Sequence, residues 1–403
     1  MGGVGMSPTI WSDLVGQEAV IDALRTAVAD ARKIERGEPG PAMTHAWLIT
    51  GPPGSGRSSA ATKFAAALVC PEDGCGRCNV CRLAPVGGHP DVEVVIPEGS
   101  TISVELTREL VDHGARLPTE APWRVIVVED ADRLNDYSGN SLLKALEEPT
   151  PQTVWVLCAP SVADVLPTIA SRTRHVSLRT PSTSDVAQLL VDSYGVDPSL
   201  AALAARASQG HIGRARGLAT DDDARIRRQR DLRIPFQLRD LSSCVAMAAD
   251  IAEAAKEAAN TRADALDATE LDLLKRRYYA EGVTKLERSL RRSYEADLKL
   301  LTQDQKRRRT RMIKDEVDRS LIDLQSLFRD VLVVQMGGDI VLINEELRPG
   351  IEQLASAGTA ADSVRRLGAL EHARRSVAAG TSAEAVLESL MVELKDPWVR
   401  ASA

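Results

Sequence analysis

The sequence predicts an α/β domain followed by helical segments. Up to about residue 180, five short apolar segments alternate with helical ones, a pattern typical of a parallel sheet with helices on both faces. A glycine-rich loop of the phosphate-binding kind follows the first apolar segment. After Pro181 the strand pattern ends. We expect an α/β domain at 1–179, a small helical domain at 180–224 and an all-helical domain at 225–403.

Composition limits the possible functions. The chain has 403 residues, 44% of them apolar, and a formal net charge of −7. Aromatic residues make up only 3%, which disfavours stacking platforms for single-stranded nucleic acid. No apolar run reaches the roughly 18 residues of a membrane span, and the N-terminus lacks the apolar core of a signal peptide. We therefore expect a cytoplasmic protein without a membrane partner.

The elements follow from hydrophobic periodicity and from the positions of proline and glycine. The expected strands are 46–50, 92–96, 124–128, 153–158 and 174–178. The third is apolar throughout, as a strand buried on both faces should be. The expected helices begin near Glu18 and continue with 60–68, 103–117, 138–148, 162–170, 183–194, 198–208 and 211–219, and almost all of the chain beyond 225 is helical in character.

The glycine-rich loop lies between the first expected strand and the next helix. It matches the phosphate-binding pattern G-x-x-x-x-G-K-[ST] except that arginine replaces the lysine. The candidate nucleotide contacts are Gly51, Gly54, Gly56, Arg57 and Ser58. Arginine keeps the charge, but its guanidinium is planar and larger than an ammonium, so the exchange is not conservative. The alternative is an ordinary strand-to-helix turn rich in glycine and proline.

An acidic pair, Glu129 and Asp130, follows the third expected strand. In phosphate-loop ATPases an Asp at such a strand end holds Mg²⁺, and a Glu after it polarises the attacking water. Here the order is reversed. Glu129 is a methylene too long for the metal role, and Asp130 is a methylene too short for the role of the base. An error of about 1 Å can cost roughly 10²-fold in rate. We expect a degenerate nucleotide site; the alternative is a pair of solvated acids.

Four of the six cysteines lie within twelve residues, with the spacing C-x4-C-x2-C-x2-C. They are Cys70, Cys75, Cys78 and Cys81. Four thiolates at this spacing can surround one ion, and Zn²⁺ is the usual occupant of such sites. Because the protein fills all four positions, we expect a structural zinc site. An iron–sulfur cluster is the alternative, and an intracellular setting disfavours disulfides.

Two arginines and one basic stretch are further candidates. Arg172 precedes the last expected strand, and Arg214 lies near the start of a helix in the expected small domain, where an arginine can contact a phosphate. Residues 275–319 carry a net charge of +7, most densely at 306–311. This stretch is either a contact for DNA phosphates or a solvated helix face interleaved with acids such as Asp315, and we favour the solvated face.

Several of these motifs occur together along residues 10–218. They are Gly16-Gln17, GPPGSGRS at 51–58, the clustered cysteines, His89-Pro90-Asp91, VIVVEDAD at 125–132, LLKALEEP at 142–149 and Ser171-Arg172. The set resembles the clamp-loader subunits of bacterial DNA polymerase III, which belong to the AAA+ class. Beyond residue 225 the resemblance is weak.

The resemblance implies a heteropentameric loader that contains gamma/tau and delta subunits and belongs to the DNA polymerase III holoenzyme at the replisome. Such a loader uses ATP to open a sliding clamp and place it on primed DNA. The pattern resembles the member whose own phosphate loop neither binds nor hydrolyses ATP. Arg172 then matches an arginine finger that reaches into a neighbour's ATP site, although Thr173 stands where the family motif has cysteine. Arg214 matches the family's small-domain arginine. In this family, residues 180–224 would be the lid domain and the helices after 225 would form the collar that joins the subunits.

Two other functions stay open. An ATPase-active subunit of the gamma/tau type needs a lysine at position 57 and an Asp-Glu pair at 129–130, and the sequence has neither. A zinc-stapled DNA-binding protein on an AAA+ frame would depend on the basic stretch at 275–319.

Overall fold

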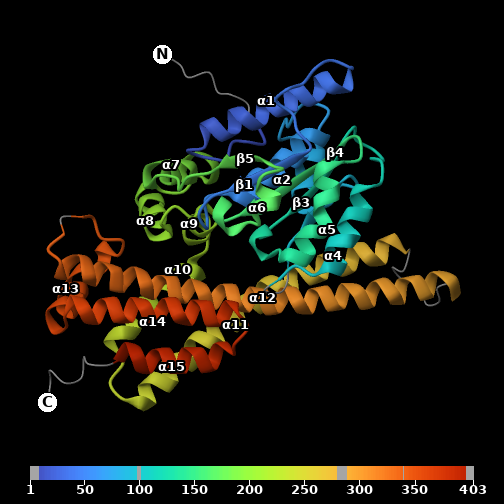
Figure 1. Ribbon diagram of the computed structural model, residues 1–403. Coiled ribbons are helices and arrows are strands. Elements are labelled where there is room, and N and C mark those ends of the chain that lie inside the picture. Colours follow the sequence, from blue (N-terminus) through green and yellow to red (C-terminus); the bar gives the residue numbers. More distant parts are fainter. Residues whose placement is uncertain (1–8, 98–100, 279–287, 339, 396–403) are drawn as a thin grey trace. The chain divides into compact units, whose positions relative to one another are not determined.

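The structure is a computed structural model that describes residues 9–97, 101–278, 288–338 and 340–395. The chain divides into two units, Met1–Asp221 and Asp222–Ala403 (Figure 1). The first contains the sheet together with the helices that were expected to form a lid. Within the described residues, no helix is both long enough and apolar enough to span a membrane.

The sheet has five parallel strands, which confirms the predicted fold class. The strands are β1 Ala46–Thr50, β2 Val92–Val95, β3 Arg124–Val128, β4 Thr153–Ala159 and β5 Arg174–Ser177. Their order is β2-β3-β4-β1-β5, so the strand before the glycine-rich loop lies between β4 and β5. This order places the loop toward one side of the sheet and β5 at its edge.

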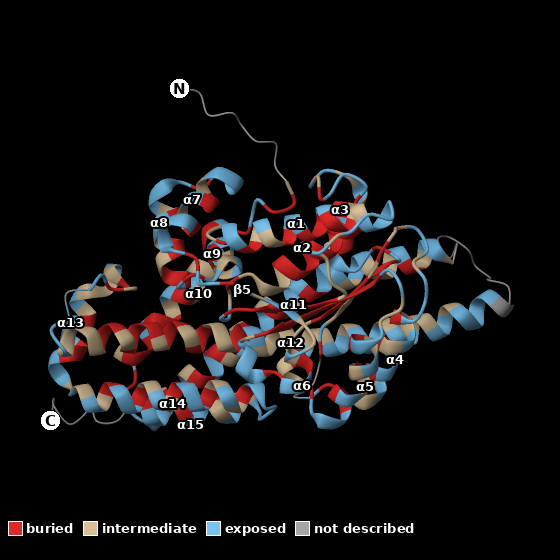
Figure 2. Ribbon diagram, turned by 45° about the horizontal axis from the view of Figure 1, so that its top comes forward, coloured by how far each residue is buried: buried red, intermediate tan, exposed pale blue. Residues whose placement is uncertain are grey.

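Helices cover both faces of the sheet, which explains why its strands are apolar at successive positions. The helices on the two faces are α1 Glu18–Glu35 and α2 Arg57–Val69 on one, and α4 Val104–Gly114, α5 Asp136–Glu147 and α6 Pro167–Ala170 on the other. In β4, Val154 and Val156 pack against the first group, while Trp155 and Leu157 pack against the second. Figure 2 shows the central strands as buried.

Side-chain caps define where two of these helices begin. The Ser103 hydroxyl accepts a hydrogen bond of 3.2 Å from the Leu106 N–H, which confirms the predicted start of α4. Asn135 caps α5 in the same way, with bonds of 3.0 Å from the N–H groups of Tyr137 and Ser138. The helix therefore begins at Asp136, slightly earlier than expected.

The first unit ends in three helices, α7 Thr183–Tyr194, α8 Pro198–Ser208 and α9 Ile212–Thr220. They share a small core that contains Val186, Leu190, Ala201 and Leu218. The first unit also contains the short helix α3, Asn79–Leu83, which belongs to the cysteine module. Short 3-10 turns cover Ala84–Val86, Ala131–Arg133 and Val162–Asp164.

The second unit consists of helices joined by turns, with no strand among its described residues. Its helices are α10 Asp222–Arg233, α11 Leu241–Arg277, α12 Arg288–Gln335, α13 Arg348–Ala357, α14 Ala360–Ala378 and α15 Ala383–Lys395, with 3-10 turns at Ile234–Phe236 and Glu345–Leu347. One face of α12 is apolar and buried, with Leu321, Leu324 and Phe328 each fully covered. Helices α11, α14 and α15 contribute to the same core.

The basic stretch differs from the expected solvated face at two of its arginines. Arg308 forms ion pairs of 2.5 Å with Asp267 and Glu270 on α11, and Arg309 forms ion pairs of 2.7 Å with Asp264 and Asp267. The acids that neutralise them thus lie on the neighbouring helix. Residues 279–287 of the stretch lie outside the described residues.

Replacing Arg308 by glutamine is expected to loosen the α11–α12 pair at this end. The Arg308 side chain is only 29% exposed and pairs with both acids, so its loss weakens the contact even though Asp267 keeps its ion pair with Arg309. We expect a loss of about 1–2 kcal/mol of local stability. Amide hydrogen exchange should quicken around residues 264–278, whereas the exposed control Lys256→Gln should not change it. Unaltered protection in the Arg308 variant would contradict a stabilising role.

The same contact should depend on pH. A hydrogen bond from Arg308 lowers the pKa of Glu270 from its ordinary value of 4.5. The stabilisation is therefore complete above pH 4.5 and is lost as the pH falls through the lower folded-state pKa. Protection of α11 measured below and above pH 4.5 tests this, and the variant should show the smaller pH dependence.

Candidate functional site

The glycine-rich loop turns from the end of β1 into the start of α2. Gly54 and Gly56 have φ angles of +83° and +95°, in the left-handed region that favours glycine. A Cβ atom at position 54 would lie 2.5 Å from side-chain carbons of His211. Two glycines of the loop thus adopt backbone angles that other residues rarely reach, and the start of α9 packs directly against the loop.

Arg57 is the first residue of α2, and its guanidinium turns back onto the loop. Its Nη1 donates a hydrogen bond of 2.6 Å to the carbonyl oxygen of Gly51. The lysine of a working loop directs its ammonium to the β- and γ-phosphates instead. Part of the donor capacity of Arg57 is therefore used inside the loop. Ser58, the candidate Mg²⁺ ligand, follows it and is half-buried.

A cleft of about 360 Å³ lies beside the loop. Its lining residues come from the N-terminal segment, the loop and helices α7 and α9; they are Asp13, Leu14, Gly54, Gly56, Arg57, Ser58, Ser59, Tyr194, His211, Ile212, Gly213 and Arg216. Arg214 is not among them, and its backbone N–H donates a bond of 3.3 Å to His211 Nδ1. The cleft thus receives its α9 arginine from position 216, because residues two apart on a helix point in different directions.

The acids after β3 lie within electrostatic reach of the loop. Asp130 has a φ angle of +49° and forms an ion pair of 3.0 Å with Arg133. Burial raises the pKa of Asp132, the charge of Asp130 raises it further, and the charges of Arg133 and Arg57 oppose this shift. Arg57 is therefore close enough to Asp132 for their charges to interact. The sequence pointed to Asp132 only as the last residue of the motif VIVVEDAD.

Arg172 lies in the turn between α6 and β5. Its Nε donates a hydrogen bond of 2.6 Å to Glu147, the last residue of α5, and its Nη1 donates one of 2.8 Å to the carbonyl oxygen of Thr168. The side chain remains 34% exposed. Glu147 thus holds a side chain that is still partly exposed to solvent. The sequence had not indicated Glu147 as a partner of Arg172.

Arg172 and the glycine-rich loop lie at opposite ends of the sheet. In the parallel pairing of β1 with β5, Arg174 is level with Trp47. Arg172 precedes that point, whereas the loop begins after the last residue of β1. At about 3.3 Å per residue, the backbone of Arg172 is roughly 20 Å from Gly51. This separation exceeds the reach of an arginine side chain, so Arg172 cannot act at the loop of its own chain.

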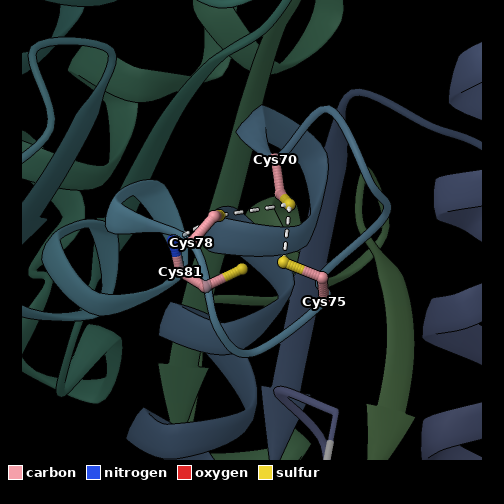
Figure 3. Close-up of side chains that lie close together, drawn as sticks. All are labelled: Cys70, Cys75, Cys78 and Cys81. Atoms are coloured by element: carbon pink, nitrogen blue, oxygen red, sulfur yellow. Dashed lines mark hydrogen bonds between the residues drawn. The ribbon is translucent and has the colours of Figure 1, made fainter.

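The four clustered cysteines converge from a helix end, a loop and α3 (Figure 3). The Sγ atom of Cys70 lies 4.0 Å from that of Cys75 and 3.7 Å from that of Cys78, and all four sulfurs lie within 4.8 Å of one another. Four sulfurs bound tetrahedrally to zinc at about 2.3 Å would be about 3.8 Å apart. The donor set and its spacing therefore fit a four-thiolate metal site.

The same module favours a thiolate at Cys75. Hydrogen bonds from backbone N–H groups, first that of Arg77 and then that of Cys78, help to lower the Cys75 pKa to about 7. Metal ligation requires deprotonated sulfur. Cys158, by contrast, is buried in β4 away from the cluster, and burial raises its pKa.

The motif His89-Pro90-Asp91 has a structural role. Asp91 is fully buried and accepts hydrogen bonds of 2.7–2.9 Å from the N–H groups of Thr119, Glu120 and Ala121. His89 Nδ1 accepts a bond of 3.1 Å from the Asp91 N–H. These contacts organise the turn before β3, and neither side chain is a ligand in the cysteine cluster.

Comparison with known proteins is informative for the first unit. A family model described as "DNA polymerase III, delta subunit" matches residues 32–182. The chain is 37% identical over 134 residues to the DNA polymerase III subunit delta-prime of Pseudomonas aeruginosa, a match that covers 32% of this chain and 41% of that protein. Residues 32–182 are therefore similar to subunits of the DNA polymerase III clamp loader.

The chain is also similar to gamma/tau subunits of DNA polymerase III. The DNA polymerase III subunit gamma/tau of Mycobacterium tuberculosis is 35% identical over 178 residues, covering 43% of this chain and 29% of that protein. A gamma subunit-related protein from Thermotoga maritima, a solved structure, is 15% identical with a TM-score of 0.42, covering 91% of this chain and 98% of that one. The chain spans less than half the length of the two curated relatives named here.

Proposed function

We propose that this chain is the delta-prime subunit of a DNA polymerase III clamp loader. In this role it assembles with gamma/tau and delta subunits, and the complex places a sliding clamp on primed DNA at the expense of ATP. The similarity of the first unit to relatives of both kinds supports a role in a clamp loader, and the loop and strand-end residues favour the delta-prime role over gamma/tau. Co-purification with gamma/tau and delta is the direct test, and a chain that never enters the complex is not this subunit.

The catalytic contribution of the chain in this proposal comes from Arg172. A guanidinium that is one-third exposed and lies at the far end of the sheet from its own loop is available to a neighbouring subunit. In a neighbour's ATP site it would stabilise the negative charge that develops on the γ-phosphate during transfer. Glu147 acts as a positioning residue, because its ion pair restricts the arginine before the interface forms.

The chain's own nucleotide site is degenerate in this proposal. Arg57 is hydrogen-bonded to the loop backbone, His211 packs against Gly54, and the acids at 129–130 are in reversed order. A triphosphate would have to displace the first two contacts. It would then meet carboxylates of the wrong length for Mg²⁺ and for the attacking water. The rival function, an ATPase of the gamma/tau type, requires a lysine at position 57 and an Asp-Glu pair at 129–130.

We expect the purified chain to show no ATP binding in the micromolar range and no measurable turnover. Arg57→Lys alone should not restore either, because His211 and the reversed acids remain. Titration calorimetry and phosphate release measure the two properties, with an active gamma/tau subunit as the positive control. Micromolar binding with turnover by the unaltered chain would favour the gamma/tau type instead.

Zinc at the cysteine module completes the proposal. Cys70, Cys75, Cys78 and Cys81 would occupy all four coordination positions, which leaves no place for a reacting water molecule. The ion would therefore tie the end of α2 to α3 and take no part in ATP chemistry.

A further inference from the structure

The C-terminal half of α11 and the N-terminal half of α12 form an ion-pair network. This network divides the basic residues of α12 into two groups. Helix α12 packs along α11, and Arg308 and Arg309 point toward it and are neutralised by its acids. The other group lies elsewhere on α12, away from this contact. The network therefore leaves a definite subset of the positive charge available for a partner.

Three members of this second group form a line, named here the outer stripe: Arg292, Lys299 and Lys306. They recur every seven residues, so they point in nearly the same direction along about 21 Å of helix. All three are exposed, and within the described part of the chain none forms an ion pair. Figure 2 shows much of this part of α12 as exposed.

The nearest acids on α12 do not neutralise the outer stripe. Glu295 forms an ion pair of 2.8 Å with Arg291, and Asp304 lies 3.7 Å from Arg307. Asp297 accepts a hydrogen bond of 2.7 Å from the Tyr278 hydroxyl. Each of these carboxylates thus has another partner, and the stripe keeps its positive potential.

The partner that fits such a surface is a regular polyanion. Duplex DNA carries one negative charge per about 1.7 Å of its axis and attracts lysine and arginine without regard to sequence. No aromatic residue belongs to the stripe, so stacking on unpaired bases has no platform here. The chemistry therefore favours the sugar–phosphate backbone of a duplex over single-stranded DNA.

We propose that the outer stripe of α12 binds the backbone of duplex DNA. This inference goes beyond the proposed function, because the stripe lies in the second unit and its contact requires neither ATP nor Arg172. It assigns to the chain a sequence-independent DNA contact of its own. Two arginines of the densest run, Arg308 and Arg309, support the helix pair instead.

The test is the salt dependence of duplex binding by the full-length chain without nucleotide. Fluorescence anisotropy with a labelled 30-base-pair duplex gives the affinity from about 0.05 to 0.3 M KCl. The variant with Arg292, Lys299 and Lys306 all changed to glutamine should lose about three phosphate contacts. The slope of log K against log salt should then fall by about 2.7, and the affinity at 0.1 M by roughly two orders of magnitude.

A matched control removes the same charge elsewhere in the second unit. Arg239, Lys256 and Arg375 are exposed, and changing all three to glutamine should leave the slope nearly unchanged. Equal thermal midpoints for the two variants exclude misfolding as the cause. An unchanged slope in the stripe variant, an equal loss in the control, or stripe-dependent binding of polyglutamate in place of DNA would overturn the proposal. Because no partner subunit or ATP is present, any of these results leaves the proposed subunit role untouched.

Discussion

Replacing Arg172 by alanine is expected to lower the ATPase activity of a reconstituted loader while leaving its assembly intact. An arginine finger supplied in trans is worth about 10³–10⁵ in kcat at the site it serves. The ATP site next to this chain should therefore become almost inactive, and total turnover should fall by the share of that site. Steady-state phosphate release from the complex, with clamp and primed DNA present, measures the effect.

Two further variants separate a finger from a structural arginine. Arg172→Lys should remain defective, because an ammonium cannot make the forked contacts of a guanidinium. Arg179→Ala is a control just beyond the other end of β5, where the side chain is 76% exposed and lies 3.6 Å from Glu18. Its ATPase should match that of the unaltered complex. Unchanged turnover in Arg172→Ala would remove the proposed role.

Glu147→Ala gives a graded form of the same test. It releases Arg172 from its strongest partner but leaves the guanidinium in place, so a positioning role predicts a partial loss of turnover. If the alanine variant of Glu147 were as inactive as that of Arg172, the glutamate itself would have to take part in the neighbour's chemistry.

Loss of the metal is expected to have the largest effect on stability. Cys81→Ser should reduce the metal content from about one zinc per chain to none and destabilise the first unit by several kcal/mol, since structural zinc contributes directly to folding. The reason is local: Cys70 and Cys81 are buried in the same core as α2, so the freed module exposes apolar surface. Elemental analysis and thermal unfolding check both parts.

Cys158→Ala is the matched control for this experiment. It also removes a buried thiol from the first unit, but from β4, so it should cost some stability while keeping the zinc. Full zinc content in Cys81→Ser would contradict the four-thiolate site. Iron with visible absorption in the unaltered protein would show that the cluster alternative is correct.

The sequence alone was enough for the α/β frame, because its signals are local. Strands buried on both faces must be apolar at successive positions, so β1, β3 and β4 were recognisable within a few residues of their bounds. The glycine-rich loop and the clustered cysteines are equally local, since each set of backbone or sulfur groups converges within one short segment. Parallel order then followed from the alternation of strands with helices.

The tertiary structure decided contacts that depend on helix phase and strand order. Whether position 214 or 216 faces the cleft is set by how α9 docks, and the packing of His211 on Gly54 joins segments far apart in the chain. The pairing of Arg308 with Asp267 and Glu270 requires the register of α12 against α11. The sequence showed which residues carry charge, but only packing determined which charges neutralise one another, because electrostatic attraction depends on distance in space.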